Sequence, residues 1–248
     1  LMGHGLEELT LTTNGTLLAD HADRLVRAGV RRVNISLDSL DPARFSEITR
    51  RGNLSKVLEG IDAALSVGLK VKINTVALRY QNMSDIPSMI EWAHARGMDM
   101  TLIEVMPLGE TGEDRVDQYV PLPMIRDHLE ARWTLSEQTQ RDASAGPSRY
   151  VSIMETGGRL GFITPLTNNF CAGCNRVRVT CTGRIYMCLG QDDHVDLRGA
   201  LRNSPDPREA LDAALDRALL AKPEKHDFAI RERGSSPTLA RHMSTTGG

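Results

Sequence analysis

The chain has 248 residues, enough for one large domain, or one domain with a smaller companion, around a real hydrophobic core. Apolar residues make up 40% and charged residues 25%, and the net charge of −2 gives no field that would recruit nucleic acid or an anionic membrane surface. The sequence shows no apolar run of the roughly 18 residues that a membrane span needs, and its start lacks the features of a signal peptide. We therefore expect a cytoplasmic protein with no nucleic-acid or membrane partner.

The first hundred residues alternate short apolar segments with amphipathic ones, a pattern typical of a parallel α/β sheet. We expect strands over residues 9–13, 33–37, 71–78 and 100–106. One helix is predicted over residues 17–28, and another where apolar side chains recur at helical spacing: Leu54, Val57, Leu58, Ile61 and Leu65. The helical segments before the second, third and fourth strands end at glycines that fit left-handed caps: Gly29, Gly68 and Gly97.

Polar side chains gather where each of these strands ends. The four segments are Thr12-Thr13-Asn14-Gly15, Ser36-Leu37-Asp38-Ser39, Lys72-Ile73-Asn74-Thr75 and Glu104-Val105-Met106-Pro107. Ligands of parallel α/β proteins bind at the carboxyl ends of the strands. The sequence therefore predicts a ligand-binding rim, with simple turn formation as the plainer alternative.

The second half of the chain has a different character. Residues 107–120 are rich in glycine and charge and are predicted to be a linker, followed by a helix over 122–132. Beyond it we expect short strands near 150–153, 160–163, 177–180 and 184–187, and helices near 196–202 and 207–220. The predicted domains are 1–120, with four βα units, and 121–248, a smaller α+β subdomain. Because four βα units cannot close a barrel, we also expect further units before residue 1.

All four cysteines lie in one short stretch, which in a cytosolic chain indicates metal binding rather than a disulfide framework. Cys171 and Cys174 form a CxxC pair, and thirteen residues separate Cys174 from Cys188. If 177–180 and 184–187 pair as a hairpin, Cys188 returns beside the CxxC pair, whereas Cys181 lies in the distant turn. Three thiolates suit a four-iron cluster with one open iron, and a four-cysteine zinc site that includes Cys181 is the alternative.

Two arginines follow the CxxC pair directly. Arg176 and Arg178 alternate along the expected strand, so both side chains point to one face. Guanidinium groups beside a metal centre can clamp a phosphate or a purine, although solvated surface arginines remain the alternative. His194 could be considered a further ligand, but it stands among three aspartates before an expected helix, as in a solvated cap.

These motifs together resemble the GTP 3′,8-cyclase family, the radical S-adenosylmethionine (SAM) lyases that start molybdenum cofactor biosynthesis. The resemblance runs from about residue 6 to residue 248. It rests on these segments: Thr12-Thr13-Asn14-Gly15, Asn34-Ile35-Ser36-Leu37-Asp38-Ser39-Leu40, Val71-Lys72-Ile73-Asn74, Ile103-Glu104-Val105-Met106-Pro107, the loop Phe170-Cys171-x-x-Cys174-Asn175-Arg176-x-Arg178, Cys188-Leu189 and the terminal Gly247-Gly248. The cysteine loop joined to a carboxyl-terminal Gly-Gly is the most specific part.

The resemblance implies a partial (βα)₆ TIM-type barrel, an α+β iron–sulfur subdomain and two four-iron clusters. One cluster cleaves SAM to a 5′-deoxyadenosyl radical, which takes a hydrogen from the ribose of GTP. The sugar carbon then attacks C8 of guanine, giving (8S)-3′,8-cyclo-7,8-dihydroguanosine 5′-triphosphate. The other cluster, held by three cysteines, binds the guanine through its open iron.

The resemblance also implies roles for individual residues. It assigns the substrate-binding cluster to Cys171, Cys174 and Cys188. It assigns GTP binding to Thr12, Lys72, Arg176, Val177 and Arg178, with Val177 contributing at most its backbone. It assigns SAM binding to Ser36 and Met106, and an active-site role to the tail residues Gly247 and Gly248.

This sequence departs from the family at several points. The CxxxCxxC motif of the radical-generating cluster is absent, because no cysteine precedes Cys171. This chain alone is therefore not expected to generate the radical, and that second cluster is expected only in an N-terminal region before residue 1. Thr101 replaces an arginine that family members often carry, which puts one phosphate contact in doubt, and Thr246 stands where an apolar residue usually precedes Gly-Gly.

Two other functions remain open at this stage. The chain could be a barrel fragment whose cysteines hold structural zinc and organise an interaction surface, or another radical SAM enzyme with an auxiliary cluster and a different substrate. The expected small-molecule partners are GTP and SAM. The sequence does not fix the oligomeric state, and a homodimer stays open.

Overall fold

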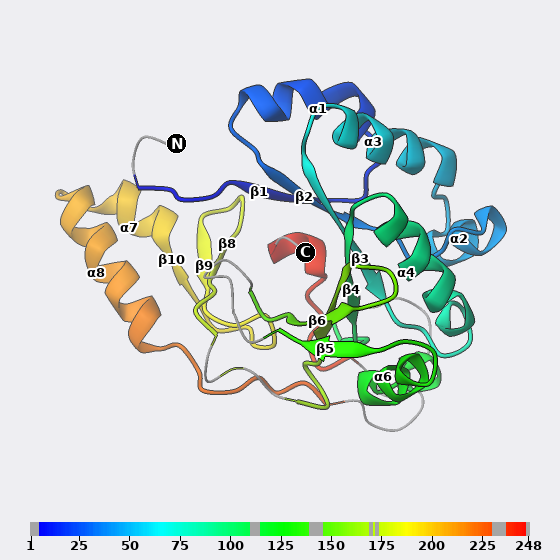
Figure 1. Cartoon of the computed structure of the whole chain (residues 1–248). Helices are drawn as coiled ribbons and strands as arrows, with labels where there is room; N and C mark the ends of the chain where they lie inside the picture. Colours follow the sequence, from blue (N-terminus) through cyan, green and yellow to red (C-terminus); the bar gives the residue numbers. More distant parts are fainter. Residues whose placement is uncertain are drawn as a thin grey trace. The chain divides into compact units, whose positions relative to one another are not determined.

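A computed structural model describes residues 5–109, 115–138, 146–168, 171, 174–229 and 237–246. The chain forms two compact units, each with its own sheet (Figure 1). The first unit comprises Leu1–Val105 and Asp117–Thr164, and the second comprises Met106–Val116 and Pro165–Gly248. In the described part of the chain, every helix is too short or too polar to span a bilayer.

The first unit is built on a seven-stranded sheet with the order β1-β2-β3-β4-β7-β6-β5. The strands are β1 (Thr10–Thr13), β2 (Arg32–Ser36), β3 (Lys70–Val76), β4 (Asp99–Ile103), β5 (Leu135–Glu137), β6 (Arg149–Ile153) and β7 (Arg159–Ile163). Neighbouring strands from β1 to β4, and β7 beside β4, run parallel, whereas β6 and β5 are added antiparallel. This mixed unit with a mostly parallel central sheet confirms the expected α/β class.

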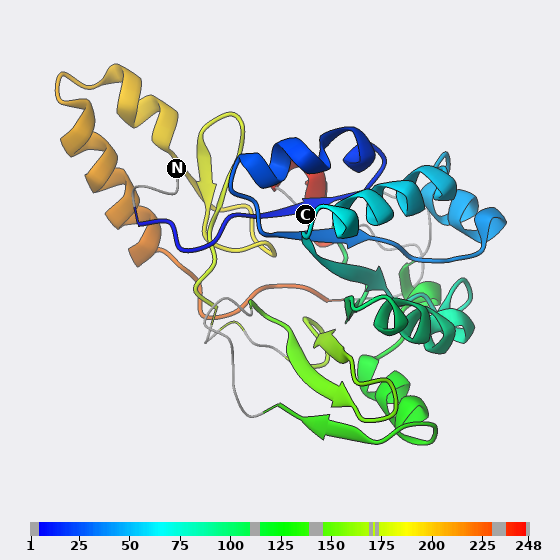
Figure 2. The same ribbon diagram turned by 45° about the horizontal axis from the view of Figure 1, so that its top comes forward.

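Helices pack along the outer side of this curved sheet (Figure 1). They are α1 (Leu18–Arg27), α2 (Pro42–Thr49), α3 (Leu54–Ser66), the 3₁₀ helix η2 (Met83–Asp85), α4 (Ile86–Ala95) and α6 (Leu122–Glu130). A further short helix, α5 (Arg115–Gln118), precedes α6 in the chain. Figure 2 shows α1 and α3 side by side. Gly60 permits this close approach, because a Cβ there would lie 2.5 Å from the carbonyl oxygen of Gly15.

The two faces of the parallel sheet differ in polarity. Ile35 and Ile73 are fully buried in the core beneath the helices. Residues of opposite parity on the same strands, Asn34, Lys72 and Asn74, are only half-buried. Because side chains alternate across a strand, the sheet has an apolar outer face and a polar inner face.

The predicted elements of the first half agree with the structure to within a few residues. Helix α2 was not predicted, although Asp41 caps it by accepting a hydrogen bond from the backbone N–H of Arg44 at 2.7 Å. The strands near 150–153 and 160–163, which the sequence grouped with the cysteine loop, belong to the large sheet, where β7 pairs with β4 and β6 pairs with β7.

The second unit contains a three-stranded antiparallel sheet with the order β10-β9-β8. Its elements are β8 (Arg178–Val179), β9 (Arg184–Tyr186), β10 (His194–Asp196), α7 (Leu197–Asn203), α8 (Pro207–Leu220) and α9 (Met243–Thr246). A separate small core forms around Ile185, Met187 and Ala218. The pairing of β8 with β9 confirms the predicted hairpin after the CxxC pair.

Candidate functional site

The hairpin of the second unit brings three cysteines to one end. The backbone N–H of Cys174 donates to the carbonyl oxygen of Cys171 at 2.9 Å, which closes the CxxC turn just before β8. Arg178 pairs with Tyr186 across the hairpin, so Cys188, two residues beyond Tyr186, returns to the same end. This end of the hairpin, with Cys171, Cys174 and Cys188, is called the cysteine site.

Cys181 and His194 lie outside the cysteine site. Cys181 is exposed in the turn at the other end of the hairpin, where the backbone N–H of Gly183 donates to Thr180. The Nδ1 atom of His194 is 2.9 Å from the carbonyl oxygen of Asp192, and the side chain is exposed. The expectation that neither residue is a ligand stays a prediction.

Lys222, which the sequence analysis missed, links the two strands of the hairpin at the end that carries the three cysteines. Its Nζ atom donates to the carbonyl oxygens of Arg176 and Met187, at 2.7 Å each. Arg176 follows Cys174 and Met187 precedes Cys188, so one ammonium group holds the chain beside two of the three cysteines. No local sequence motif predicts this contact, because Lys222 lies more than thirty residues beyond both Arg176 and Met187 in the chain.

The thiols of the cysteine site are close enough to affect one another. Burial raises the pKa of Cys171, the backbone of His226 opposes this, and the nearby charges of Cys188 and Cys174 raise it further. Burial also raises the pKa of Cys174, but hydrogen bonds from the backbone and side chain of Arg176, together with the positive charges there, make the net shift downward. Positive charge beside Cys174 therefore favours the thiolate, the form that binds metal.

Three guanidinium groups converge beside the thiols. Burial lowers the pKa of Arg178, and the positive charges of Arg176 and Arg241 lower it further, against the opposing effect of Cys174 and Cys188. Among the described residues, Arg178 has no carboxylate within ion-pair distance. A buried cation crowded by like charges is unfavourable by itself, and such an arrangement is typical of an anion-binding site.

Arg241 is the second residue that the sequence analysis missed. Its side chain is only 7% exposed, and it pairs with Asp192 at 2.8 Å. The guanidinium also donates to the carbonyl oxygens of Leu189 and Gln191 and lies 4.1 Å above the ring of Tyr186. Arg241 therefore fastens the C-terminal segment to the loop that follows Cys188.

The chemistry of the thiol donor set suits an iron–sulfur cluster. Within the described ranges, no three His, Cys, Asp or Glu side chains are close enough together to hold one ion. A tetrahedral zinc site with bonds of about 2.3 Å requires its sulfur atoms to lie within roughly 3.8 Å of one another. The cysteine sulfurs that bind a four-iron cluster lie farther apart, because each binds a different iron atom. Three thiols at one end of the hairpin, with Cys171 affected by the charges of the other two, are compatible with the wider group.

Three of the other predicted binding residues lie on the polar face of the sheet in the first unit. Thr12 of β1 is in register with Asn34 of β2, which is in register with Lys72 of β3. Ser36 lies two residues beyond Asn34 on the same face. The structure thus brings Thr12, Ser36 and Lys72 to one face of the sheet.

The remaining predicted residues lie elsewhere. Met106 belongs to the second unit, where its carbonyl oxygen accepts from the backbone N–H of Leu108. Val177 is 38% exposed beside Arg178. Gly247 and Gly248 lie outside the described residues.

Comparison with protein families defines the class. Residues 3–93 match the model described as the Radical SAM superfamily, and residues 98–228 match the model described as Molybdenum Cofactor Synthesis C. The chain is therefore a radical SAM protein of the kind associated with molybdenum cofactor synthesis.

Individual relatives narrow the assignment. A protein of Erythrobacter litoralis named GTP 3′,8-cyclase is 63% identical over 247 residues, covering 100% of this chain and 73% of the relative. Proteins of the same name from Sinorhizobium medicae and Rhodopseudomonas palustris are 58% and 59% identical, covering 98% of this chain and 69% and 70% of theirs. The chain belongs to the GTP 3′,8-cyclase family.

Proposed function

We propose that the protein acts in the conversion of GTP to (8S)-3′,8-cyclo-7,8-dihydroguanosine 5′-triphosphate, the first step of molybdenum cofactor biosynthesis. Family membership, the full-chain identity to proteins named GTP 3′,8-cyclase and the two matched family models support this function. Its sheet of parallel strands is proposed to be part of a (βα)₆ barrel.

We further propose that Cys171, Cys174 and Cys188 hold a four-iron cluster. When bound, this cluster would supply an open iron for the guanine of GTP. The CxxxCxxC motif of the SAM-cleaving cluster does not occur in these 248 residues, so the proposal for their cysteines covers the guanine-binding cluster alone.

The chain's own residues would bind and orient the two small molecules. Arg176 and Arg178 would neutralise and grip the nucleotide, with the backbone of Val177 between them. Thr12 and Lys72 would contact GTP from the polar face of the sheet. SAM would be contacted by Ser36 and Met106, and the Gly247-Gly248 tail would approach the substrate, where the lack of side chains avoids clashes.

One observation carries the proposal: Arg178 is largely buried, next to Arg176 and Arg241, on the hairpin that also carries the three thiols. Burying one arginine against others is costly unless an anion compensates them. Positive charge and a metal-binding donor set at one place fit a ligand that has both phosphates and a metal-binding heterocycle, as GTP has.

The test measures metal content and GTP affinity in anaerobically reconstituted protein. We expect about four irons per chain and GTP affinity that falls roughly 10- to 150-fold in Arg176→Ala or Arg178→Ala, as for loss of a charged hydrogen bond. Arg184→Ala is the matched control, because Arg184 is exposed at the other end of the same hairpin. Colourless protein with one zinc, or GTP affinity indifferent to both changes, would contradict the proposal.

A further inference from the structure

Residues 222–228 of the second unit lie against the loop that follows Cys188. The side chain of Gln191 in this loop donates from Nε2 to the carbonyl oxygen of Lys225 at 3.3 Å. The same Nε2 atom donates to the carboxylate of Asp227 at 3.1 Å. One amide group therefore ties the loop after the last cysteine to a segment more than thirty residues farther along the chain.

Gly190, the neighbour of this glutamine, packs against two aromatic residues of the same segment. A Cβ atom at Gly190 would lie 2.6 Å from the Cβ atom of His226 and 3.2 Å from two ring carbons of Phe228. The Nδ1 atom of His226 accepts from the backbone N–H of Phe228 at 3.2 Å, and the two ring centroids are 4.6 Å apart. The imidazole therefore fixes the backbone of its own segment over a position where only glycine fits.

Each of these two touching segments places one backbone N–H group on a thiol. The N–H of Gly190 donates to the Sγ atom of Cys188 at 3.4 Å. The backbone N–H of His226 donates to the thiol of Cys171. The third thiol of the cysteine site also accepts from the backbone, so all three sulfurs have an N–H donor.

We propose that His226 is a positioning residue that sets the reduction potential of the cluster held by the three cysteines. It does so by keeping two backbone N–H groups, its own and that of Gly190, on two of the cysteine sulfurs. The imidazole itself touches no iron in this arrangement, because its Nδ1 atom is engaged by the backbone of Phe228. The inference rests on the proposed function, since it concerns the cluster proposed there.

The direction of the effect follows from charge. Hydrogen bonds to the cysteine sulfurs are among the factors that set the reduction potential of an iron–sulfur cluster. An N–H donor stabilises negative charge on sulfur, and the reduced cluster carries one electron more than the oxidised cluster. Each N–H donor therefore raises the reduction potential, and its loss lowers it.

Two variants disturb the donors from opposite sides. His226→Leu keeps similar bulk but removes the acceptor for the N–H of Phe228, so the backbone of residue 226 loses its brace. The φ of Gly190 is not positive, so Gly190→Ala changes the available space and not the backbone preference. Because the Cβ atom of His226 moves only with its backbone, the new methyl group must push the two segments apart.

The test measures the reduction potential of the reconstituted chain by electron paramagnetic resonance during a redox titration. All four cysteines lie between residues 171 and 188, so one cluster gives the signal. For each lost hydrogen bond, the ratio of reduced to oxidised cluster at a fixed potential should fall roughly 3- to 10-fold. At 59 mV per tenfold for one electron, this is a lowering of about 30–60 mV.

A conservative variant and a control separate positioning from general damage. In His226→Asn, the side-chain oxygen lies close to the place of Nδ1 and can accept the same hydrogen bond, so most of the shift should disappear. His128→Leu is the matched control, because His128 is exposed on α6 of the first unit, and it should have the wild-type potential.

The outcomes distinguish this inference from the proposed function. A loaded cluster with the wild-type potential in both His226→Leu and Gly190→Ala would overturn the positioning role and leave the function intact. An equal shift in His226→Asn and His226→Leu would do the same, as would folded variants that hold no cluster, because the contacts would then serve assembly alone. If one variant fails to fold, the other decides. A wild-type chain that holds no cluster would overturn both the role and the proposed function.

Discussion

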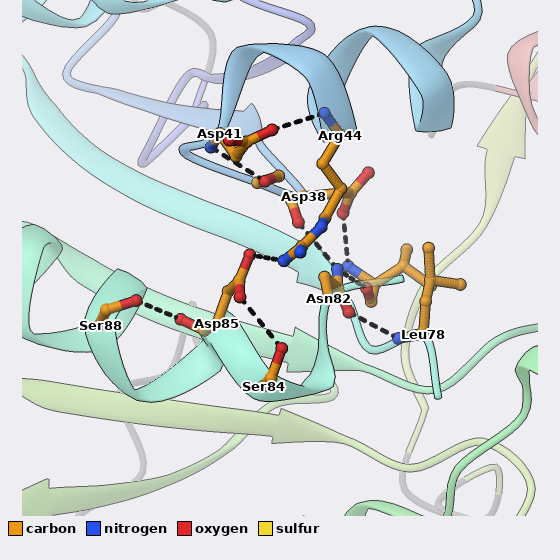
Figure 3. A network of polar contacts seen from close by, with 10 residues as sticks. Asp38, Asp41, Arg44, Leu78, Asn82, Ser84, Asp85 and Ser88 are labelled. Atoms are coloured by element: carbon orange, nitrogen blue, oxygen red, sulfur yellow. Dashed lines mark hydrogen bonds and ion pairs between the residues drawn. The ribbon is translucent and has the colours of Figure 1, made fainter. Parts of the chain in front are cut away.

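Asn82 is the centre of a polar network that joins the ends of β2 and β3 (Figure 3). Its side chain is fully buried, and its Oδ1 atom accepts from the backbone N–H of Leu78 at 2.8 Å. Its Nδ2 group donates to the carbonyl oxygen of Asp38 at 2.8 Å and to that of Val76 at 2.9 Å. One side chain therefore satisfies three backbone groups of two different loops.

Replacing Asn82 by Ala removes all three hydrogen bonds and leaves their backbone partners unpaired in a buried place. At about 1–1.5 kcal/mol for each bond, the free energy of unfolding should fall by about 3–4.5 kcal/mol. Such a loss is at the upper end of single-residue effects and is expected only where a buried network breaks.

Equilibrium unfolding in urea measures this loss, provided that the slope against urea concentration is unchanged. Asn53→Ala is the matched control, because Asn53 caps α3 with one hydrogen bond to the backbone N–H of Lys56, at 3.3 Å. Loss of that cap should cost about 1 kcal/mol. If Asn82→Ala cost no more than Asn53→Ala, the view of Asn82 as a shared partner of three groups would be refuted.

Two further predictions concern charge. Burial raises the pKa of Asp38 to about 6, against a backbone hydrogen bond that lowers it. The folded state then binds an extra proton between about pH 4 and pH 6, and stability falls as the pH rises through that window. Because the Asp38 side chain is partly accessible, we expect Asp38→Asn to add only about 1–2 kcal/mol to the free energy of unfolding at pH 7.5, and almost nothing at pH 4. Urea unfolding at the two pH values checks this. An effect of the same size at both pH values would contradict it. Lys222→Met should at least halve the iron bound per chain, with unchanged circular dichroism, because two carbonyl oxygens beside the cysteines lose their shared hydrogen-bond donor. Lys225 is exposed, so the control variant Lys225→Met should bind as much iron as the wild type.

Local patterns were sufficient to predict much of the first unit. Strands such as β3 alternate buried apolar with accessible polar residues, and helix α3 carries an apolar stripe, so hydrophobic period alone identifies both. The β8–β9 hairpin was predictable because Gly183 supplies the left-handed turn conformation that its position requires, with a φ of 80°.

Contacts between distant segments were not predictable from local patterns. The residues Lys222, His226 and Arg241 reach their sites from segments far along the chain, and nothing near them in sequence marks a partner. The pairing of β7 with β4 was not predictable for the same reason, because the order of strands in a sheet depends on the packing of the whole sheet and not on the sequence of either strand. Helix α2 was missed since it is short and only Phe45 is buried in it.

The charge distribution shows how a chain with a net charge of −2 can present cationic sites. In each unit, a carboxylate is already paired with an arginine: Asp99 with Arg159 in the first, and Asp192 with Arg241, one of the three guanidiniums beside the thiols, in the second. Lys72 and Arg178 are consequently left without acidic partners among the described residues. A local excess of positive charge therefore depends on which residues pair and not on overall composition, and removal of either pairing arginine should free a carboxylate to compete with an anionic ligand.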